Sequence, residues 1–330
     1  MKTKIITFDP QGDGSELAPA ARALLQGETV VFPTETVYGL GAVWDDAEAV
    51  RNIFRIKGRP QDNPLIVHES SAERMKLYFA AWDEVAQVLT DAFCPGPFTL
   101  IMKKKKALQS PAAAGLDTIA VRIPSHKVPR KLVALCGKGL AAPSANISGR
   151  PSPTNARDAA EDLDGKVPYI INGGSCDYGV ESTIISWPNG RLELLRPGGI
   201  SAERIEKTLQ AHGLDVPLIK PSADKLRKEK ITRAPGMKYR HYAPAADVHV
   251  ISGKNTAEKL QLLASLYKQK AFPGKILFYI SEELASEMQE SLPELYKAAV
   301  SVITFPTEKS HQAAARGLFA AFRETDRLGA

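Results

Sequence analysis

The sequence lacks several features that would place it in a special class of protein. No run of about 18 apolar residues occurs, so no membrane span is expected. The first residues also lack the apolar core and the cleavage site of a secretory signal peptide. Cys94, Cys136 and Cys176 are odd in number and far apart. They predict reduced thiols in a cytoplasmic protein and argue against a disulfide framework.

Familiar catalytic signatures are missing as well. The sequence contains no GxxxxGK[ST] and no GxGxxG, which excludes a P-loop and an ordinary dinucleotide site. GxSxG is absent, and no His/Cys group has zinc-ligand spacing. A hydrolase has little support, although a histidine that is distant in sequence could still approach a cysteine in space. Without an obvious nucleophile, we expect catalysis by placement and charge stabilisation, as in phosphoryl and nucleotidyl transfer.

Length and composition are those of a globular protein with more than one domain. The chain has 330 residues, of which 44% are hydrophobic and 24% charged, with a net charge of +6. Nine Lys and Arg against four Asp and Glu lie in residues 206–246, which therefore carry most of the positive excess. This segment could attract a polyanion such as ATP or tRNA. Composition alone favours the alternative, a solvated linker.

Hydrophobic periodicity and turn residues predict an α/β protein. We expect strands at 29–32, 65–68, 98–102, 118–123 and 169–171, a hairpin of strands 182–187 and 191–196, and helices at 15–26, 45–55, 71–79, 82–93, 128–136 and 201–212. From residue 247 strands at 248–251, 275–280 and 300–304 alternate with helices at 256–270, 282–290 and 310–327. That alternation predicts a small parallel α/β domain. The predicted division is a first domain at 1–212, a linker at 213–246 and a second domain at 247–330.

The first two-thirds of the chain hold four polar loops of a similar kind. The central one is FPTETVYGLG at 32–41, which follows a short buried strand, and the others are KGRPQDNP at 57–64, AAPSANISG at 141–149 and the region from NGG at 172–174 to RPG at 196–198. If the loops converge, they bring together cations, hydroxyls, amides and an imidazole: Lys57, Arg59, Arg122, Arg196, Thr34, Thr36, Ser144, Ser148, Ser152, Ser182, Asn63, Asn146 and His68. Such a set suits a ligand rich in anionic oxygens.

The segment at 234–244, APGMKYRHYAP, is too rich in aromatic and basic residues for a passive spacer. We expect it to lie over the pocket as a lid. The four lysines at 103–106 could touch RNA, but an exposed turn is the simpler interpretation.

These motifs resemble a known family. FPTETVYGLG, KGRPQDNPLIVH, APSANISG and STI…LLRPG are similar to the YrdC-type threonylcarbamoyl-AMP synthases. The segment APGMKYRHYAP and the second α/β domain resemble the long, two-domain form, so the resemblance covers the whole chain. Ala234 stands where the family pattern has a serine, and Ala142 where family members carry a hydroxyl residue.

The resemblance implies a fold, a reaction and a set of partners. The first domain would be a twisted, open, mostly parallel sheet with a large concave basic cavity, and the second a smaller Rossmann-like parallel domain. L-threonine, bicarbonate and ATP, with Mg²⁺ bound to the ATP and not to protein side chains, would give threonylcarbamoyl-AMP and pyrophosphate. The product would pass to a tRNA threonylcarbamoyltransferase complex, which modifies tRNA next to the anticodon.

Site roles follow from the resemblance residue by residue. L-threonine would be held by Thr36, His68, Arg122 and Ser182. ATP would be held by Arg59, Asn63, Thr118, Ser144, Asn146, Ser152, Arg196 and Tyr242. Lys57, Arg59 and Arg196 would offset the charge that develops on the phosphates during catalysis.

Two further hypotheses belong to other functional classes. A module that binds tRNA or double-stranded RNA is suggested by the basic segment at 206–246, and it predicts RNA binding that weakens steeply with salt. A hydrolase related to carbamoyl-phosphate chemistry is suggested by maturation factors that carry a similar domain. Those factors also carry zinc-finger and acylphosphatase segments, which this chain lacks.

Overall fold

The computed structural model describes residues 2–222, 224, 232–237, 243–272, 274–307 and 310–329. The chain divides into two compact units, Met1–His241 and Tyr242–Ala330. The first unit includes most of the predicted linker. Ile219, which lies in that linker, forms a β-bridge with Glu193. The exact limits predicted for the linker stay a prediction.

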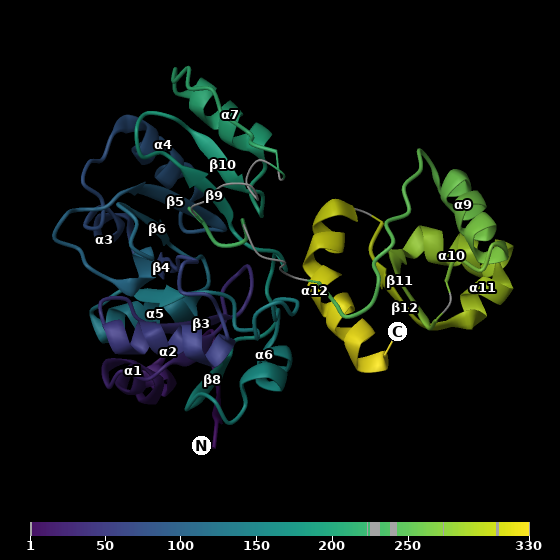
Figure 1. Ribbon diagram of the computed structural model, residues 1–330, viewed down its shortest axis with the longest axis horizontal. Helices are drawn as coiled ribbons and strands as arrows, with labels where there is room; N and C mark the ends of the chain where they lie inside the picture. Colours follow the sequence, from purple (N-terminus) through teal and green to yellow (C-terminus); the bar gives the residue numbers. More distant parts are fainter. Residues whose placement is uncertain are drawn as a thin grey trace. The chain divides into compact units, whose positions relative to one another are not determined.

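The first unit is built on one large sheet (Figure 1). The sheet has 10 strands among the described residues, in the order β1-β8-β2-β3-β7-β4-β6-β5-β9-β10. The strands are β1 (Lys4–Thr7), β2 (Val30–Phe32), β3 (Gly39–Val43), β4 (Ile66–His68), β5 (Phe98–Lys103), β6 (Thr118–Arg122), β7 (Leu140–Ala142), β8 (Tyr169–Asn172), β9 (Thr183–Ser186) and β10 (Glu193–Arg196). Crossovers are numerous, so residues far apart in the sequence become neighbours.

Strand directions in this sheet are mixed. The pairs β1–β8, β2–β8, β4–β6 and β5–β9 are parallel. The pairs β2–β3, β3–β7, β4–β7, β5–β6 and β9–β10 are antiparallel. The expected open α/β sheet is confirmed, but it is a mixed sheet and not the mostly parallel one that we expected. The concave basic cavity stays a prediction.

Helices begin and end where the sequence supplies caps. In α2 (Ala47–Lys57) the Asp46 side chain accepts hydrogen bonds from two backbone N–H groups, and the helix ends at Gly58, which has φ 61°. In α7 (Ala202–Ala211) the Ser201 side chain caps the first turn. The other helices of this unit are α1 (Ala18–Leu25), α3 (Ala72–Lys76), α4 (Glu84–Phe93), α5 (Lys127–Cys136) and α6 (Ala156–Leu163), with short 3₁₀ turns at Ser15–Leu17 and Pro111–Ala113.

The strands at the β4-to-β10 end alternate their side chains between two different faces. Val67, Leu100, Val121 and Ile185 pack in one core cluster with residues of α4 and α7. The residues between them on the same strands point to the opposite face, where Ile66, Ile101, Ala120, Ile184 and Leu195 form a second cluster. Ala234 and Met237, from the predicted lid segment, complete this second cluster and are buried. The lid segment therefore packs, in its described part, on the face of the sheet opposite α4 and α7.

The second unit contains a parallel strand pair, β11 (Ile276–Ser281) and β12 (Ala299–Phe305). Around it lie α9 (Thr256–Lys268), α10 (Glu282–Ser291), α11 (Pro293–Ala298) and α12 (Ser310–Leu328). The parallel α/β character is confirmed. The strand predicted at 248–251 is wrong: those residues form no strand, and Val248 and Val250 are exposed. An alternating apolar pattern does not by itself produce a strand where no neighbouring strand pairs with the segment.

Three strands and one helix of the first unit were not predicted: β1, β3, β7 and α6. β3 and β7 lie inside stretches that we expected to be loops, and α6 follows the polar residues at 150–155. Short strands rich in glycine and alanine have little intrinsic strand signal, so pairing with neighbouring strands decides whether they form.

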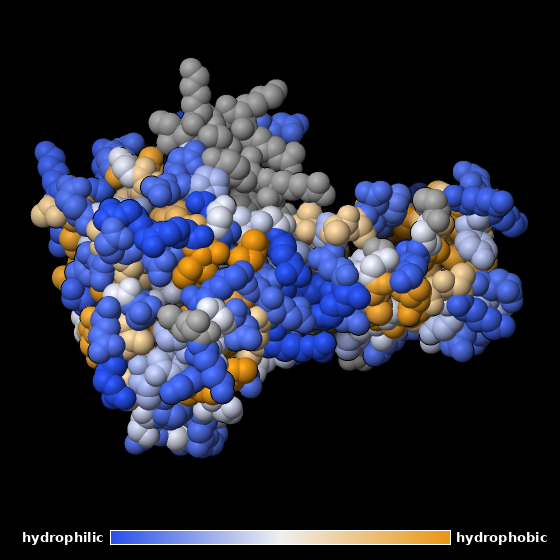
Figure 2. Space-filling model, turned by 60° about the horizontal axis from the view of Figure 1, so that its bottom comes forward, coloured by the Kyte–Doolittle hydropathy of each residue, from blue (hydrophilic) through white to orange (hydrophobic). Residues whose placement is uncertain are grey.

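Hydrophilic residues cover most of the face in Figure 2, with hydrophobic residues in small separate groups. No helix in the described part of the chain is both long and apolar enough to cross a membrane.

Candidate functional site

One row of residues crosses five neighbouring strands at the site. His68 on β4 is the register partner of Arg122 on β6, and Arg122 is the partner of Thr99 on β5. Thr99 pairs in turn with Ile184 on β9, and Ile184 with Arg196 on β10. Directly opposed residues project from the same face of a sheet. Three of the predicted site residues, distant in sequence, are therefore brought to one face.

A bulge in β10 helps to place the last member of this row. Leu194 pairs with Ile185, but the next pairing joins Arg196 to Ile184, so Leu195 is the extra residue. A bulge changes the direction in which the following side chain points. Here the bulge allows Leu195 to join the apolar cluster while Arg196 stays in register with the cross-strand row.

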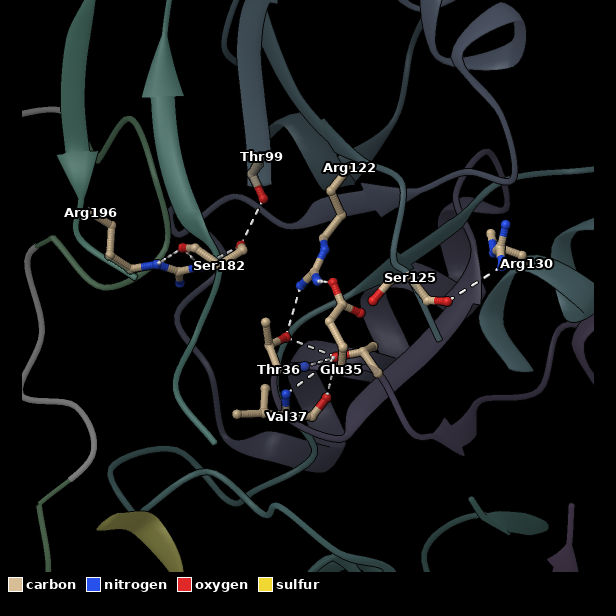
Figure 3. Close-up of polar contacts among 10 residues, drawn as sticks. Glu35, Thr36, Val37, Thr99, Arg122, Ser125, Arg130, Ser182 and Arg196 are labelled. Atoms are coloured by element: carbon tan, nitrogen blue, oxygen red, sulfur yellow. Dashed lines mark hydrogen bonds and ion pairs between the residues drawn. The ribbon is translucent and has the colours of Figure 1, made fainter. Parts of the chain in front are cut away.

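Arg122 is held by the central loop. Its Nη1 donates to the Thr36 hydroxyl at 3.0 Å, and its Nη2 donates to Glu35 Oε1 at 2.5 Å (Figure 3). Both side chains of the ion pair are buried, with 4% exposure for Arg122 and 1% for Glu35. Thr34 orders the same loop, because its hydroxyl donates to the Val37 carbonyl and accepts from backbone N–H groups.

Arg196 and Ser182 form the other end of the row. Arg196 Nη2 donates to the Ser182 carbonyl at 2.9 Å and to its hydroxyl at 3.0 Å, and the Ser182 hydroxyl lies 2.7 Å from that of Thr99 (Figure 3). Gly198 permits this arrangement, because a Cβ there would lie 2.3 Å from the Glu181 carbonyl oxygen. Backbone contact this close has room only for glycine.

His68 is a neutral member of the row. Burial, together with the nearby positive charge of Arg122, lowers its pKa from 6.5 to about 3. Its Nδ1 lies 3.2 Å from the Ile66 carbonyl oxygen and 3.3 Å from that of Leu140. We infer that Nδ1 carries the proton and that Nε2 remains available as an acceptor.

Lys57 joins the second predicted loop to the third. It ends α2, is 1% exposed, and its Nζ donates to the carbonyl oxygens of Ser144, at 2.5 Å, and Asn146. The Ser148 N–H donates to the Lys57 carbonyl in return. The Ser144 hydroxyl donates to Asn146 Oδ1 at 2.5 Å. A buried ammonium therefore orders the segment at 144–148.

Arg59 and Asn63 lie in the loop that follows α2. Arg59 donates to the carbonyl oxygens of Asn63, at 3.4 Å, and Pro64, at 3.2 Å. Asn63 is 1% exposed, yet neither its amide oxygen nor its amide nitrogen has a hydrogen-bond partner among the described residues. An unsatisfied buried amide costs free energy unless a ligand pairs with it.

The central loop connects these two groups. Tyr38 accepts a backbone hydrogen bond from Ala145, Gly39 forms a bridge with Ser144, and Thr36 contacts Arg122. The Glu35 carbonyl also accepts from the Tyr178 N–H, in the region that leads to Ser182. Contacts thus link all four predicted loops into one network.

Three predicted residues lie apart from these contacts. Ser152 donates to Glu181, the neighbour of Ser182, at 2.6 Å. Thr118 shares the strand and the face of Arg122 but lies four residues away along β6, roughly 13 Å by strand rise. Tyr242 lies outside the described residues.

Sequence reasoning assigned no role to Glu35 or Thr99. Glu35 lies within the central motif, and its burial beside Arg122 could not be inferred from its neighbours in sequence. Thr99 is a single hydroxyl residue in the apolar strand 98–102. Its only sequence signal is that a polar residue interrupts a buried strand.

The arrangement suits binding and charge stabilisation more than nucleophilic attack. Strand register and hydrogen bonds link guanidinium, ammonium and hydroxyl groups in one network, which favours a ligand with carboxylate or phosphate oxygens. Burial raises the pKa of the thiols, to about 12 for Cys94 and about 11 for Cys136, and also raises that of Cys176. Neutral thiols are poor nucleophiles, so the structure does not support cysteine catalysis.

Two family models match this chain. Residues 22–198 match the Sua5, YciO and YrdC model, described as "Telomere recombination", and residues 200–330 match the "Threonylcarbamoyl-AMP synthase, C-terminal domain". Together they cover both structural units.

Individual relatives agree with these models. A threonylcarbamoyl-AMP synthase of Pyrococcus abyssi is 41% identical over 299 residues, 86% of this chain and 86% of the relative. That of Bacillus subtilis is 43% identical over 267 residues, 81% of this chain and 73% of the relative. The crystal structure of P. abyssi Sua5 complexed with L-threonine superposes with a TM-score of 0.86 at 39% identity, over 98% of this chain and 89% of that one. The chain therefore belongs to the Sua5, YciO and YrdC family, in the two-domain form that carries the C-terminal domain of the threonylcarbamoyl-AMP synthases.

Proposed function

We propose that this protein is an L-threonylcarbamoyladenylate synthase, a nucleotidyltransferase. It would convert L-threonine, bicarbonate and ATP into threonylcarbamoyl-AMP and pyrophosphate. The observation that carries the proposal is the cross-strand row from His68 through Arg122 to Arg196, joined by the central loop to the Lys57–Ser144 contact. The P. abyssi relative that superposes on almost the whole chain was crystallised with L-threonine, which supports an amino-acid site of the same kind here.

The threonine end of the site is assigned to the middle of the row. The carboxylate of L-threonine would pair with the guanidinium of Arg122, whose Nε has no partner among the described residues. Thr36, Ser182 and the Nε2 of His68 lie around it and offer hydroxyl groups and an acceptor to the hydroxyl of the ligand. These contacts fix the orientation of a small polar molecule.

The nucleotide end is assigned to the group around Lys57. The unpaired amide of Asn63 presents an acceptor and a donor side by side, which matches a ligand edge that also carries both, such as that of adenine. Arg59 and Arg196 would offset phosphate charge from two sides, with Ser144, Asn146 and Ser152 as neighbouring polar groups. Thr118 and Tyr242 keep their predicted roles in ATP binding as part of this proposal.

Magnesium would enter with the nucleotide. No group of three or more His, Cys, Asp and Glu side chains suited to a metal ion occurs among the described residues. Mg²⁺ is commonly bound through substrate phosphates with retained waters, so the residues present fit an ion that ATP brings. When bound, it would neutralise charge on the phosphate oxygens.

The chemistry would then depend on placement. The amine of L-threonine takes up bicarbonate to give a carbamate, and a carbamate oxygen attacks the α-phosphorus, from which pyrophosphate departs. The protein holds the two reactants side by side and offsets the developing charge with Lys57, Arg59 and Arg196. In the cytoplasm the product would serve a transferase complex that forms threonylcarbamoyladenosine next to the anticodon of tRNA.

Pyrophosphate release tests this proposal. Release from ATP should require L-threonine and bicarbonate together, and L-serine should be a poorer substrate. Equal release without bicarbonate, or with L-serine at the same rate, would contradict it. The RNA-binding hypothesis predicts instead salt-sensitive RNA binding without ATP turnover, and no contact of the described residues favours it over the synthase.

A further inference from the structure

The ion pair between Arg122 and Glu35 is incomplete on the side of the carboxylate. Glu35 Oε1 accepts from Arg122 Nη2 at 2.5 Å, but Oε2 is buried and has no hydrogen-bond partner among the described residues. A buried carboxylate oxygen without a donor costs free energy. The oxygen would therefore gain from any donor that reaches it, and most from a cation.

The neighbouring groups of the protein do not supply that donor. His126 accepts from the Val128 N–H through Nδ1, and its other ring nitrogen lies 3.4 Å from the Gly173 carbonyl oxygen. The thiols of Cys94 and Cys176 lie near enough for the charge of Glu35 to raise their pKa values, but neither thiol forms a hydrogen bond to Oε2. Arg122 is thus the cation that pairs with Glu35 in the described part of the chain.

We propose that Glu35 binds the amino group of L-threonine through Oε2 and accepts its proton during carbamate formation. This inference depends on the proposed function. L-threonine is a zwitterion, and a buried site must offer partners to both of its charges. The Arg122–Glu35 pair provides one group of each sign within a single contact, so the carboxylate of the ligand pairs with Arg122 and its ammonium with Glu35.

The proposed proton transfer balances. The ammonium gives one proton to Glu35, which becomes a carboxylic acid, and the nitrogen gains a free electron pair. That pair forms the N–C bond to the carbon of bicarbonate, one C–O bond breaks, and the departing hydroxide takes a second proton from nitrogen to become water. A carbamate with one N–H and one negative charge remains. Glu35 returns its proton to solvent after the product leaves.

The charge balance explains why an acid is suited to this position. The substrate amine begins positive and ends as part of an anionic carbamate beside the carboxylate that Arg122 holds. A permanently ionised group would repel that product at close range. The ionised carboxylate attracts the ammonium of the substrate, and after it has taken up the proton it is neutral and does not repel the carbamate. Glu35 would therefore act first as a binding group and then as a general base.

A ligand without the amino group separates this role from a structural one. (R)-3-hydroxybutyrate keeps the carboxylate, the hydroxyl and the methyl group of L-threonine but has hydrogen in place of the amine. Binding of both ligands to the full chain is measured by calorimetry. In Glu35→Gln we expect L-threonine to bind about 10–100-fold more weakly, the effect of losing a charged hydrogen bond. (R)-3-hydroxybutyrate should bind as before or more tightly, because Arg122 is no longer shared with a carboxylate.

Glu69→Gln is the matched control. Glu69 is also 1% exposed and pairs with an arginine, Arg74, at 2.7 Å, but its side chain contacts Tyr78 on the core side of the sheet. This variant should leave the ratio of the two affinities unchanged. If Glu35→Gln weakens both ligands by the same factor, or leaves L-threonine unaffected, the proposed role of Glu35 is wrong. If the unmodified protein does not bind L-threonine, the proposed function itself fails.

A double variant keeps the proposal testable should Glu35→Gln fail to fold. Glu35→Gln with Arg122→Met removes both buried charges together, a change that proteins often tolerate. It should bind L-threonine and (R)-3-hydroxybutyrate equally weakly, and a preserved preference for L-threonine would overturn the assignment.

The turnover rate of the single variant tests the acceptor role. In Glu35→Gln with saturating L-threonine, kcat should fall about 10²–10⁴-fold because the proton acceptor is lost. An unchanged kcat would exclude the acceptor role.

Discussion

Lys57 and Ser144 are 87 residues apart in the chain, yet Lys57 Nζ donates to the Ser144 carbonyl oxygen at 2.5 Å. This contact joins the end of α2 to the loop after β7 and places a buried positive charge where the proposed nucleotide would lie. The same side chain thus orders a loop and contributes charge. Its removal should show both effects.

Lys57→Met should lower pyrophosphate release about 10²–10³-fold, the usual effect of losing one charge-stabilising donor. It should also lower stability by about 1–3 kcal/mol, because the carbonyl groups of Ser144 and Asn146 lose their donor. Lys138→Met is the control, since Lys138 pairs with Asp45 at the exposed surface. Activity of Lys57→Met close to that of the control would contradict the assignment.

Arg122→Ala should raise the KM for L-threonine while ATP affinity stays nearly the same, because Arg122 is assigned to the carboxylate of the amino acid. The variant also leaves Glu35 buried without its cation, so stability should fall by about 3–5 kcal/mol. Arg74→Ala breaks the similar pair with Glu69 but should leave the KM unchanged. An unchanged threonine response in a folded Arg122→Ala protein would show that the assignment is wrong.

Deletion of residues 234–244 should cripple turnover and leave the first unit folded. Ala234 and Met237 lie against Ile66, Ile101 and Ile184, beside the polar row, so the deletion removes the described anchor of the predicted lid. A Gly/Ser stretch of equal length serves as control for the connection between the two units. Circular dichroism reports the fold, and pyrophosphate release the activity. Full activity in either variant would refute the lid hypothesis.

Acid should destabilise the first unit through His68. The unfolded chain binds a proton at this residue below about pH 6.5, whereas burial keeps it neutral in the folded protein down to about pH 3. Its folded-state pKa is lowered, so its contribution to stability is complete above pH 6.5 and is lost as pH falls toward 3.

Urea unfolding at pH 7.5 and at pH 5.0 measures this effect. The difference attributable to His68 should be about 2 kcal/mol between these values. It should shrink in His68→Gln and persist in His212→Gln, which alters an exposed histidine. The same loss of stability in His68→Gln and in the unmodified protein would exclude His68 as its source.

Gly198→Ala should be among the most damaging single-methyl additions in the first unit. The added Cβ would lie 2.3–2.5 Å from backbone atoms of residues 181–183, and backbone cannot move aside as a flexible side chain can. We expect a loss of stability of about 1–3 kcal/mol or more and weaker threonine binding, since Ser182 would shift. Gly149→Ala, at a glycine with nothing within 4 Å of the added Cβ, tests backbone strain without overlap. Equal behaviour of the two variants would contradict the steric explanation.

Secondary structure was predictable where periodicity and caps agree. The helices predicted at 45–55 and 201–212 form, with Asp46 and Ser201 as their caps, and the turn at 188–190 joins the antiparallel strands β9 and β10. The strand expected at 248–251 does not form, and β1, β3, β7, α6 and α11 were not predicted. Burial and strand pairing decide such short segments, and neither is visible in a single sequence.

The sequence by itself determined which chemical groups the protein has and on which loops they lie. Motif composition was enough to select Arg122, Lys57, Ser144 and Arg196 as candidates and to indicate an anionic ligand. The order of the strands and their register are decided only by tertiary structure, because pairing depends on packing between segments far apart in the chain. That register sets His68, Arg122 and Arg196 in one row, and the packing of the central loop leaves one buried oxygen of Glu35 without a partner among the described residues.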